Sequence, residues 1–137
     1  MALLNPYLTF TGNCEEAFEF YKSIFGGEYN YVSKFKDMPP NENYPISVED
    51  ADKIMHIGLP ISSETILYGS DTIGAYVDQT SIGNNISLSI TAESKENTEQ
   101  LFYGLAEGGT ITMPLESTFW GEYFGMVTDK FGIHWMI

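Results

Sequence analysis

Cysteine and basic residues are scarce in this sequence, and each shortage argues against a class of site. Cys14 is the only cysteine, so neither an intrachain disulfide nor a thiolate metal cluster can form. Six Lys and Arg residues stand against 19 Asp and Glu residues, which gives a formal net charge of −13. Phosphate binding needs clustered basic side chains, so nucleic acid and anionic membranes are poor partners. A neutral or cationic small molecule fits this charge better.

Long apolar runs are also missing from the sequence. No segment approaches the roughly 18 apolar residues of a membrane span. The first ten residues, MALLNPYLTF, lack the charged start and apolar core of a signal peptide, so we expect a cytoplasmic protein. Hydrophobic residues make up 43% of the 137 residues and aromatic residues 15%, which indicates a single folded domain over residues 1–137.

The first half of the chain has the pattern of a strand followed by a capped amphipathic helix. Residues 3–10 predict a strand, and Asn13 followed by Glu16 is typical of a helix N-terminus. Gly26-Gly27 would end the helix, because glycine tolerates the left-handed conformation there. Cys14 falls in the first helical turn, where the dipole can lower a thiol pKa, although a lone cysteine is more often a packed small residue. The apolar stripe of this helix consists of Ala17, Phe18, Tyr21, Ile24 and Phe25.

The second half repeats this order of elements. Alternating apolar and serine residues over 86–90 predict a strand, Ser94 can cap a helix, and Gly108-Gly109 would end it. The apolar stripe of this second helix consists of Thr98, Leu101, Phe102, Leu105 and Ala106. The parallel between the halves predicts an internal repeat. Two unrelated strand–helix units in another α+β fold are the alternative.

Three strand-like runs follow each predicted helix, so each half reads as βαβββ. The runs lie near 28–36, 53–61 and 64–69 in the first half, and near 110–119, 122–128 and 133–137 in the second. We therefore predict an α+β fold with one module over about 1–72 and another over about 84–137. Residues 37–52 and 70–84 would be loops, either lids of a binding site or tolerated surface excursions.

Several stretches resemble the PhnB-like branch of the vicinal-oxygen-chelate superfamily, the glyoxalase/bleomycin-resistance/dioxygenase proteins. They are NPYLTF (5–10), EEAFEFYKSIFGGE (15–28), KFKDMPP (34–40), KIMHIG (53–58), YGSD (68–71), GNNISLSI (83–90) and TMPLESTFWGEYFGMVTDKFGIHWMI (112–137). The resemblance implies two βαβββ modules whose curled mixed sheets enclose a cavity, usually in a homodimer. The branch often carries the label of a demethylubiquinone methyltransferase. No G-x-G-x-x-G follows a strand, so a nucleotide-fold methyltransferase site is unsupported.

The resemblance also implies positions for a divalent metal, which this sequence does not fill with suitable ligands. These positions fall at about Pro6, beside Asn5 and Tyr7, near Gly69 to Asp71, near Asn85 and near Met136. Proline and methionine are not ligands for hard metals, asparagine is a weak one, and only Asp71 is a plausible ligand. We therefore predict no metal and no cofactor.

Five residues remain as candidates for ligand binding: His56, Asp71, Trp120, Tyr123 and His134. His56 alternates with Met55, Ile57 and Leu59, so it faces away from them, and His134 shares a face with Met136. Trp120 and Tyr123 are expected on strands, where an aromatic ring suits a ligand cavity, although core packing is the common role. Trp120→Ala would then weaken ligand binding by roughly 1 to 3 kcal/mol and leave the fold intact.

Three functions stay open on this sequence. The first is a metal-free protein that binds a small hydrophobic or cationic molecule. The second is a metal-dependent lyase, isomerase or dioxygenase with shifted ligands, for which His56, His134 and Asp71 are the only support. The third is a dimeric structural module without a ligand.

Overall fold

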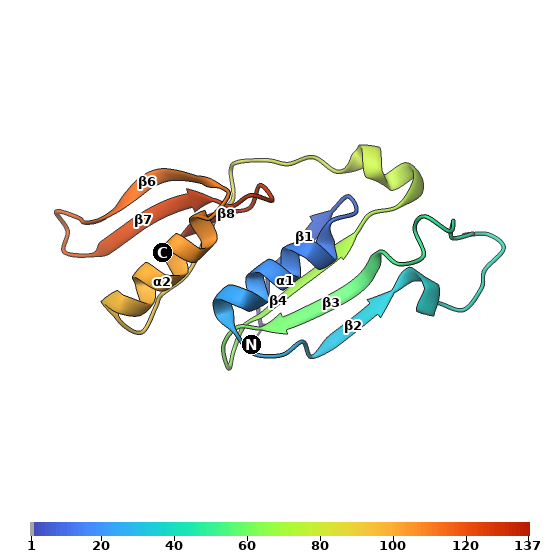
Figure 1. The fold of residues 1–137 in the computed structure, drawn as a ribbon, viewed down its shortest axis with the longest axis horizontal. Helices are drawn as coiled ribbons and strands as arrows, with labels where there is room; N and C mark the ends of the chain where they lie inside the picture. Colours follow the sequence, from blue (N-terminus) through green and yellow to red (C-terminus); the bar gives the residue numbers. More distant parts are fainter. Residues whose placement is uncertain (1) are drawn as a thin grey trace. The chain divides into compact units, whose positions relative to one another are not determined.

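The computed structural model describes residues 2–137, and the chain divides into two compact units, one up to Ser81 and the other over Ile82–Ile137. Each unit contains one four-stranded sheet and one α-helix (Figure 1). The boundary between the units falls within the predicted linker 70–84. Within the described residues, no helix has the length and apolar character needed to cross a membrane.

The first unit has the order βαβββ and a mixed, open sheet. Its strands lie side by side in the order β1-β4-β3-β2, with β1 parallel to β4 and the other pairs antiparallel. The elements are β1 (Tyr7–Phe10), α1 (Cys14–Phe25), β2 (Tyr31–Lys34), β3 (Ile54–Pro60) and β4 (Ile66–Asp71). Short 3-10 helices lie at Phe35–Asp37 and Gly74–Gln79.

The second unit repeats this topology. Its sheet has the order β5-β8-β7-β6, again with the first and last strands parallel and the other pairs antiparallel. The elements are β5 (Leu88–Ser89), α2 (Lys95–Ala106), β6 (Thr110–Ser117), β7 (Tyr123–Thr128) and β8 (His134–Met136). The predicted repeat of two βαβββ modules is therefore confirmed.

Helix α1 lies on one face of the first sheet (Figure 1), where Ala17, Phe18 and Tyr21 of its predicted apolar stripe are buried and Ile24 and Phe25 are half-buried. Phe18 presses against Gly69 of β4 so closely that a Cβ at Gly69 would lie 2.5 Å from the phenyl ring. The buried side chains beneath α1 alternate with exposed ones along β1 and with half-buried ones along β4, as expected for a sheet covered on one side. They are Leu8, Phe10, Ile57, Leu59 and Leu67.

Helix α2 covers one face of the second sheet in the same way. Ser94 caps it as predicted, because its hydroxyl accepts a hydrogen bond from the backbone N–H of Asn97 at 3.0 Å. Phe102 lies against Gly125 of β7, where an added Cβ would come within 2.5 Å of the ring. The predicted stripe residues Thr98, Leu101, Phe102 and Leu105 are buried.

Some sequence-based expectations differ from the structure in detail. The first strand begins at Tyr7 rather than near residue 3, and Leu3 and Leu4 are exposed. Trp120 does not lie on a strand, because β6 ends at Ser117 and a hairpin loop follows. In that loop the backbone N–H of Thr118 donates to the Glu122 carbonyl at 2.7 Å, and Gly121 adopts a φ of 92°.

Candidate functional site

The face of the first sheet opposite α1 carries a row of tyrosines. The strand register places Tyr7, Tyr68, Gly58 and Tyr31 directly beside one another on β1, β4, β3 and β2. Directly paired residues project from the same face of a sheet. Tyr7 and Tyr31 are about half exposed, so the row is open to solvent.

His56 lies two residues before Gly58 on β3 and therefore projects from the same face. Its ring centroid is 5.3 Å from that of Tyr68, 5.5 Å from Tyr31 and 5.7 Å from Tyr7. Its Nδ1 lies 3.2 Å from the Tyr7 hydroxyl, within hydrogen-bonding distance. We call Tyr7, Tyr31, His56 and Tyr68 the tyrosine–histidine cluster.

Gly58 is required in the middle of this cluster because the space above it is taken. A Cβ at Gly58 would collide with the side-chain oxygen of Asn30 and approach the Tyr68 ring to 3.2 Å. Asn30 is fixed in turn by its backbone N–H, which donates to the Gly58 carbonyl at 3.0 Å. An amide oxygen therefore lies beside the three phenols and the imidazole of the cluster.

Ser33 pairs with His56 across β2 and β3, so its side chain belongs to the same face. The residue is buried, and its hydroxyl has no hydrogen-bond partner within residues 2–137. Buried hydroxyls without partners are uncommon in folded proteins.

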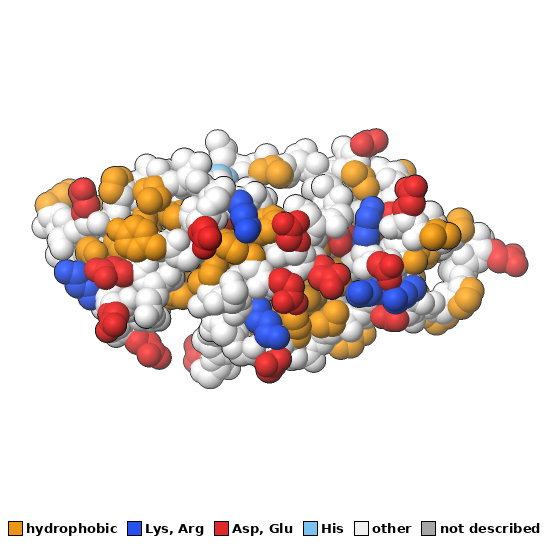
Figure 2. All heavy atoms as spheres, in the orientation of Figure 1, with side chains coloured by type: hydrophobic (Ala, Val, Ile, Leu, Met, Phe, Trp, Pro, Cys, Tyr) orange, Lys and Arg blue, Asp and Glu red, His pale blue; other side chains and the backbone are white. Residues whose placement is uncertain are grey.

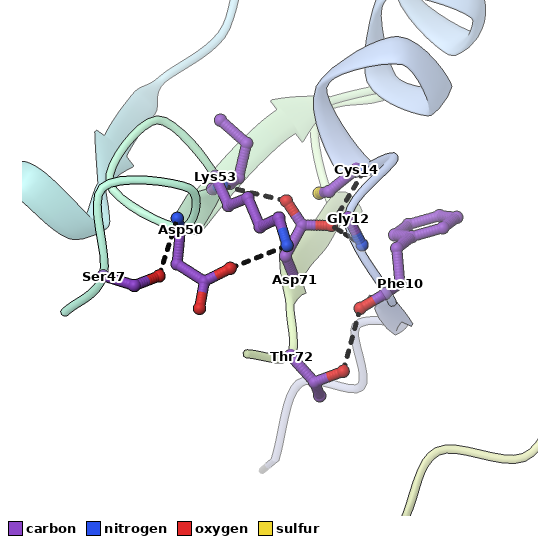
Figure 3. Close-up of polar contacts among 9 residues, drawn as sticks. Phe10, Gly12, Cys14, Ser47, Asp50, Lys53, Asp71 and Thr72 are labelled. Atoms are coloured by element: carbon purple, nitrogen blue, oxygen red, sulfur yellow. Dashed lines mark hydrogen bonds and ion pairs between the residues drawn. The ribbon is translucent and has the colours of Figure 1, made fainter. Parts of the chain in front are cut away.

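Asp71 is buried and lies on the α1 side of the sheet, away from the cluster. Its Oδ1 accepts hydrogen bonds from the backbone N–H groups of Gly12 and Cys14, and its Oδ2 accepts one from Ile54 (Figure 3). The carboxylate thus caps the start of α1, where Asn13 makes no side-chain capping bond. Burial, and then the charge of Asp71, raises the pKa of the neighbouring Cys14 thiol, which is opposite to the lowering that the helix dipole could cause.

His134 lies on β8 in the second unit, and both of its ring nitrogens are engaged. Nε2 lies 2.8 Å from the backbone carbonyl of Gly83, and Nδ1 lies 2.8 Å from the Thr128 hydroxyl. A carbonyl oxygen only accepts hydrogen bonds, so Nε2 carries a proton.

Trp120 and Tyr123 are in different environments. The Trp120 side chain is exposed in the hairpin loop, and its Nε1 donates to Glu122 at 3.3 Å. Tyr123 faces α2, where its hydroxyl donates to Glu99 at 3.0 Å and Lys95 lies 4.9 Å above its ring. Burial, and then the bond to Glu99, raises the pKa of Tyr123.

The residues at the superfamily's metal positions do not fit a metal ion. Pro6 and Met136 offer no hard donor, and the oxygens of Asp71 already accept three backbone hydrogen bonds. Among residues 2–137, no group of three or more His, Cys, Asp or Glu side chains is placed to hold a metal.

The lysines are paired with acidic or aromatic side chains, as the neighbouring blue and red atoms of Figure 2 illustrate. Ion pairs join Lys22 to Glu28, Lys34 to Glu15, Lys36 to Asp52 and Lys53 to Asp50. Lys95 and Lys130 lie over the rings of Tyr123 and Phe131. Each lysine therefore has a local partner, and an anionic ligand would have to compete for it.

Of the five candidates from the sequence, only His56 lies in the cluster. Asp71 is placed on the opposite face of the same sheet, and Trp120, Tyr123 and His134 belong to the other unit. The three tyrosines of the cluster, Tyr7, Tyr31 and Tyr68, were not among the five candidates. The alternation of residues along each strand could have indicated them. Tyr7 alternates with the buried Leu8 and Phe10, and Tyr68 with the buried Leu67, so both tyrosines project from the face opposite the core.

Comparison with known proteins assigns the chain to a family. A profile of the family described as 3-demethylubiquinone-9 3-methyltransferase matches residues 3–137. The chain belongs to this family. The Escherichia coli protein YjdN, a similar family relative, is 34% identical over 98% of this chain and 92% of its own length.

Solved structures place this family member in the glyoxalase/bleomycin-resistance fold, as the sequence predicted. Protein PA1353 from Pseudomonas aeruginosa is 38% identical with a TM-score of 0.79, over 99% of this chain and 96% of that chain. A putative 3-demethylubiquinone-9 3-methyltransferase, PhnB protein, from Bacillus cereus is 27% identical with a TM-score of 0.75, over 97% and 95%. A glyoxalase/bleomycin resistance protein/dioxygenase family enzyme from Burkholderia phytofirmans shares the fold, with 19% identity and a TM-score of 0.60, over 96% and 94%. The PhnB-like resemblance is thereby confirmed.

Proposed function

We propose that this PhnB-like protein binds a small hydrophobic or cationic molecule on the tyrosine–histidine cluster without a metal ion. The observation that carries the proposal is the gathering of three tyrosines around His56 on a sheet face that α1 leaves open. Aromatic faces bind flat apolar molecules by stacking and organic cations through the ring quadrupole. Helix α1 and the buried core occupy the other face of this sheet.

Charge supports a neutral or cationic ligand. The net charge of −13 attracts cations and repels anions. The four lysines of the first unit are held in ion pairs with acidic side chains. An anionic substrate would therefore find no unpaired lysine in that unit.

A metal-independent site is part of the same proposal. A metal-dependent lyase, isomerase or dioxygenase would need several converging donors, and His134 already uses both ring nitrogens in hydrogen bonds. Plasma mass spectrometry on protein purified without chelator is expected to find no stoichiometric metal. About one tightly held transition metal per chain would contradict this part.

Titration followed by NMR tests the binding site. Phenyltrimethylammonium and acetophenone serve as the cationic and the neutral probe, and at least one is expected to shift resonances of Tyr7, Tyr31, His56 and Tyr68. Tyr31→Ala is expected to weaken that binding by roughly 1 to 2 kcal/mol, the scale for losing an aromatic contact. Tyr76→Ala is the matched control, because Tyr76 is an exposed tyrosine of the same unit outside the cluster. Equal effects of the two variants, or no shift with either probe, would refute the proposal.

Trp120 stays a candidate for ligand binding within the second unit, separately from the cluster. Its indole is exposed in the β6–β7 loop, within 4.8 Å of the Phe119 ring centroid. Trp120→Ala is expected to leave the melting temperature unchanged, because an exposed loop side chain contributes little to the core. If the titrations of wild type and variant coincide, Trp120 takes no part in binding.

A further inference from the structure

The two ring nitrogens of His56 have different surroundings. Nδ1 lies 3.2 Å from the Tyr7 hydroxyl, whereas Nε2 has no hydrogen-bond partner within residues 2–137. The ring itself is held between Tyr68, at an interplanar angle of 27°, and Tyr31, at 54°. Such packing limits rotation of the imidazole, so Nδ1 is the nitrogen that stays beside the Tyr7 hydroxyl.

The direction of this hydrogen bond follows from the chemistry of the two groups. A phenol O–H is more acidic than a neutral imidazole N–H, and an imidazole nitrogen accepts hydrogen bonds better than a phenol oxygen. The bond is therefore stronger when Tyr7 donates to Nδ1. A neutral imidazole carries one proton, which then must lie on Nε2.

We propose that Tyr7 is a positioning residue that fixes His56 in the tautomer with its proton on Nε2. The cluster then offers one hydrogen-bond donor beside a set of aromatic rings. This inference rests on the proposed function and narrows its ligand. The molecule that fits is flat, conjugated and neutral, and it carries an acceptor such as a carbonyl oxygen to receive the Nε2 hydrogen.

The tautomer can be measured without any ligand. Long-range ¹H–¹⁵N NMR of the imidazole rings distinguishes the two tautomers, and the chain has only two histidines, His56 and His134. In its neutral form, wild-type His56 is expected to show a protonated Nε2 alone. Tyr7→Phe keeps the ring and removes the hydroxyl, so His56 should become a mixture of both tautomers.

His134 provides the matched control. Tyr7→Phe should leave the His134 signals unchanged, and Thr128→Val, which removes the hydroxyl near Nδ1 of His134, should change those signals and spare His56. If wild-type His56 carries its proton on Nδ1, or if Tyr7→Phe leaves its tautomer unchanged, the inference is overturned.

A pair of probes tests the ligand class. Acetophenone and α-methylstyrene have nearly the same shape, but only acetophenone has a carbonyl oxygen. Wild type is expected to prefer acetophenone, and Tyr7→Phe to lose roughly two- to tenfold of that preference, the scale of one hydrogen bond. Equal binding of both probes to wild type would overturn the inference that the ligand carries a hydrogen-bond acceptor. Absence of any shift with either probe or with phenyltrimethylammonium would remove the proposed function, while the tautomer measurement would still decide the role of Tyr7.

Discussion

Asp71 of β4 joins the start of α1 and the start of β3 through three hydrogen bonds to one buried carboxylate. The backbone N–H groups of Gly12 and Cys14 belong to the start of α1, and that of Ile54 belongs to the start of β3. All three bonds go to a charged acceptor, and such bonds are stronger than those between neutral groups. Asp71, which the sequence analysis expected to bind a ligand, therefore connects the sheet to its helix through hydrogen bonds.

Replacing Asp71 by asparagine should therefore destabilise the first unit. The amide keeps one acceptor oxygen but turns an NH₂ group toward backbone donors, at a cost of roughly 2 to 4 kcal/mol. Urea unfolding of Asp71→Asn measures the loss, and Asp78→Asn, at an exposed position after β4, is the control. A variant as stable as wild type would show that the cap contributes little.

Cys14 is expected to be unreactive while the protein is folded. Burial and the Asp71 charge raise its pKa, so the folded chain holds the thiol proton more tightly than the unfolded chain does. The stability linked to this proton is present below the unfolded thiol's pKa of about 8.5, and it is lost as the pH rises through the higher folded value.

The rate at which the thiol reacts with an aromatic disulfide reagent measures the reactivity of Cys14. Urea unfolding at pH about 7 and about 10 measures the pH dependence of stability. Labelling should follow unfolding, and the free energy of unfolding should fall toward the higher pH. The variant Cys14→Ala removes the thiol and should show less of that fall. Fast labelling of the folded chain would contradict the expected burial.

At the scale of elements, each helix packs on its sheet through a phenylalanine whose ring contacts a strand glycine. Phe18 lies on Gly69 in the first unit, and Phe102 lies on Gly125 in the second. A methyl group at either glycine would come within about 2.5 Å of ring carbon atoms. Contacts this short force the helix or the ring to move.

Gly69→Ala and Gly125→Ala should each destabilise the protein by roughly 1 to 3 kcal/mol, the usual cost of overpacking a core. Thermal melts monitored by circular dichroism would measure this. Gly83→Ala is the matched control, because only the Asn85 side chain lies within 4 Å of an added Cβ there. If all three variants melt at the same temperature, an added methyl group at Gly69 or Gly125 costs no stability, and the prediction is wrong.

The helices were the most predictable elements, because local signals define them. Ser94 caps α2 through its own hydroxyl, and Gly26 follows the last residue of α1 with a φ of 77°. The Asp71 cap was not predictable, since it depends on parallel pairing of β1 and β4, which are far apart in the sequence. The tyrosine–histidine cluster is a similar case, because it collects side chains from four strands whose register no local pattern defines.

At the scale of the whole molecule, each unit's sheet ends in edge strands that pair with a single neighbour among the described strands. Strand β6 is the outermost strand of its sheet, and its apolar residues Ile111 and Met113 are exposed. Exposed apolar edges are normally covered or paired. We therefore propose that two copies of the chain assemble about a two-fold axis, as the family resemblance implied.

Light scattering after size-exclusion chromatography should therefore give twice the chain mass of 15.4 kDa. Measurement over a range of micromolar concentrations separates a stable dimer from a weak one, because mass action dissociates only the latter. A monomer mass at every concentration would argue against the homodimer.

Both tryptophans of the chain, Trp120 and Trp135, belong to the second unit, whereas the cluster in the first unit is built from tyrosines and a histidine. Trp135 is buried and donates through Nε1 to Asp129 at 2.8 Å. Indole fluorescence excited at the red edge of absorption therefore reports on one half of the molecule, while far-ultraviolet dichroism reports on both. A melt in which the two optical signals separate would reveal that the halves unfold as independent bodies, and a melt in which they coincide would reveal a single cooperative unit.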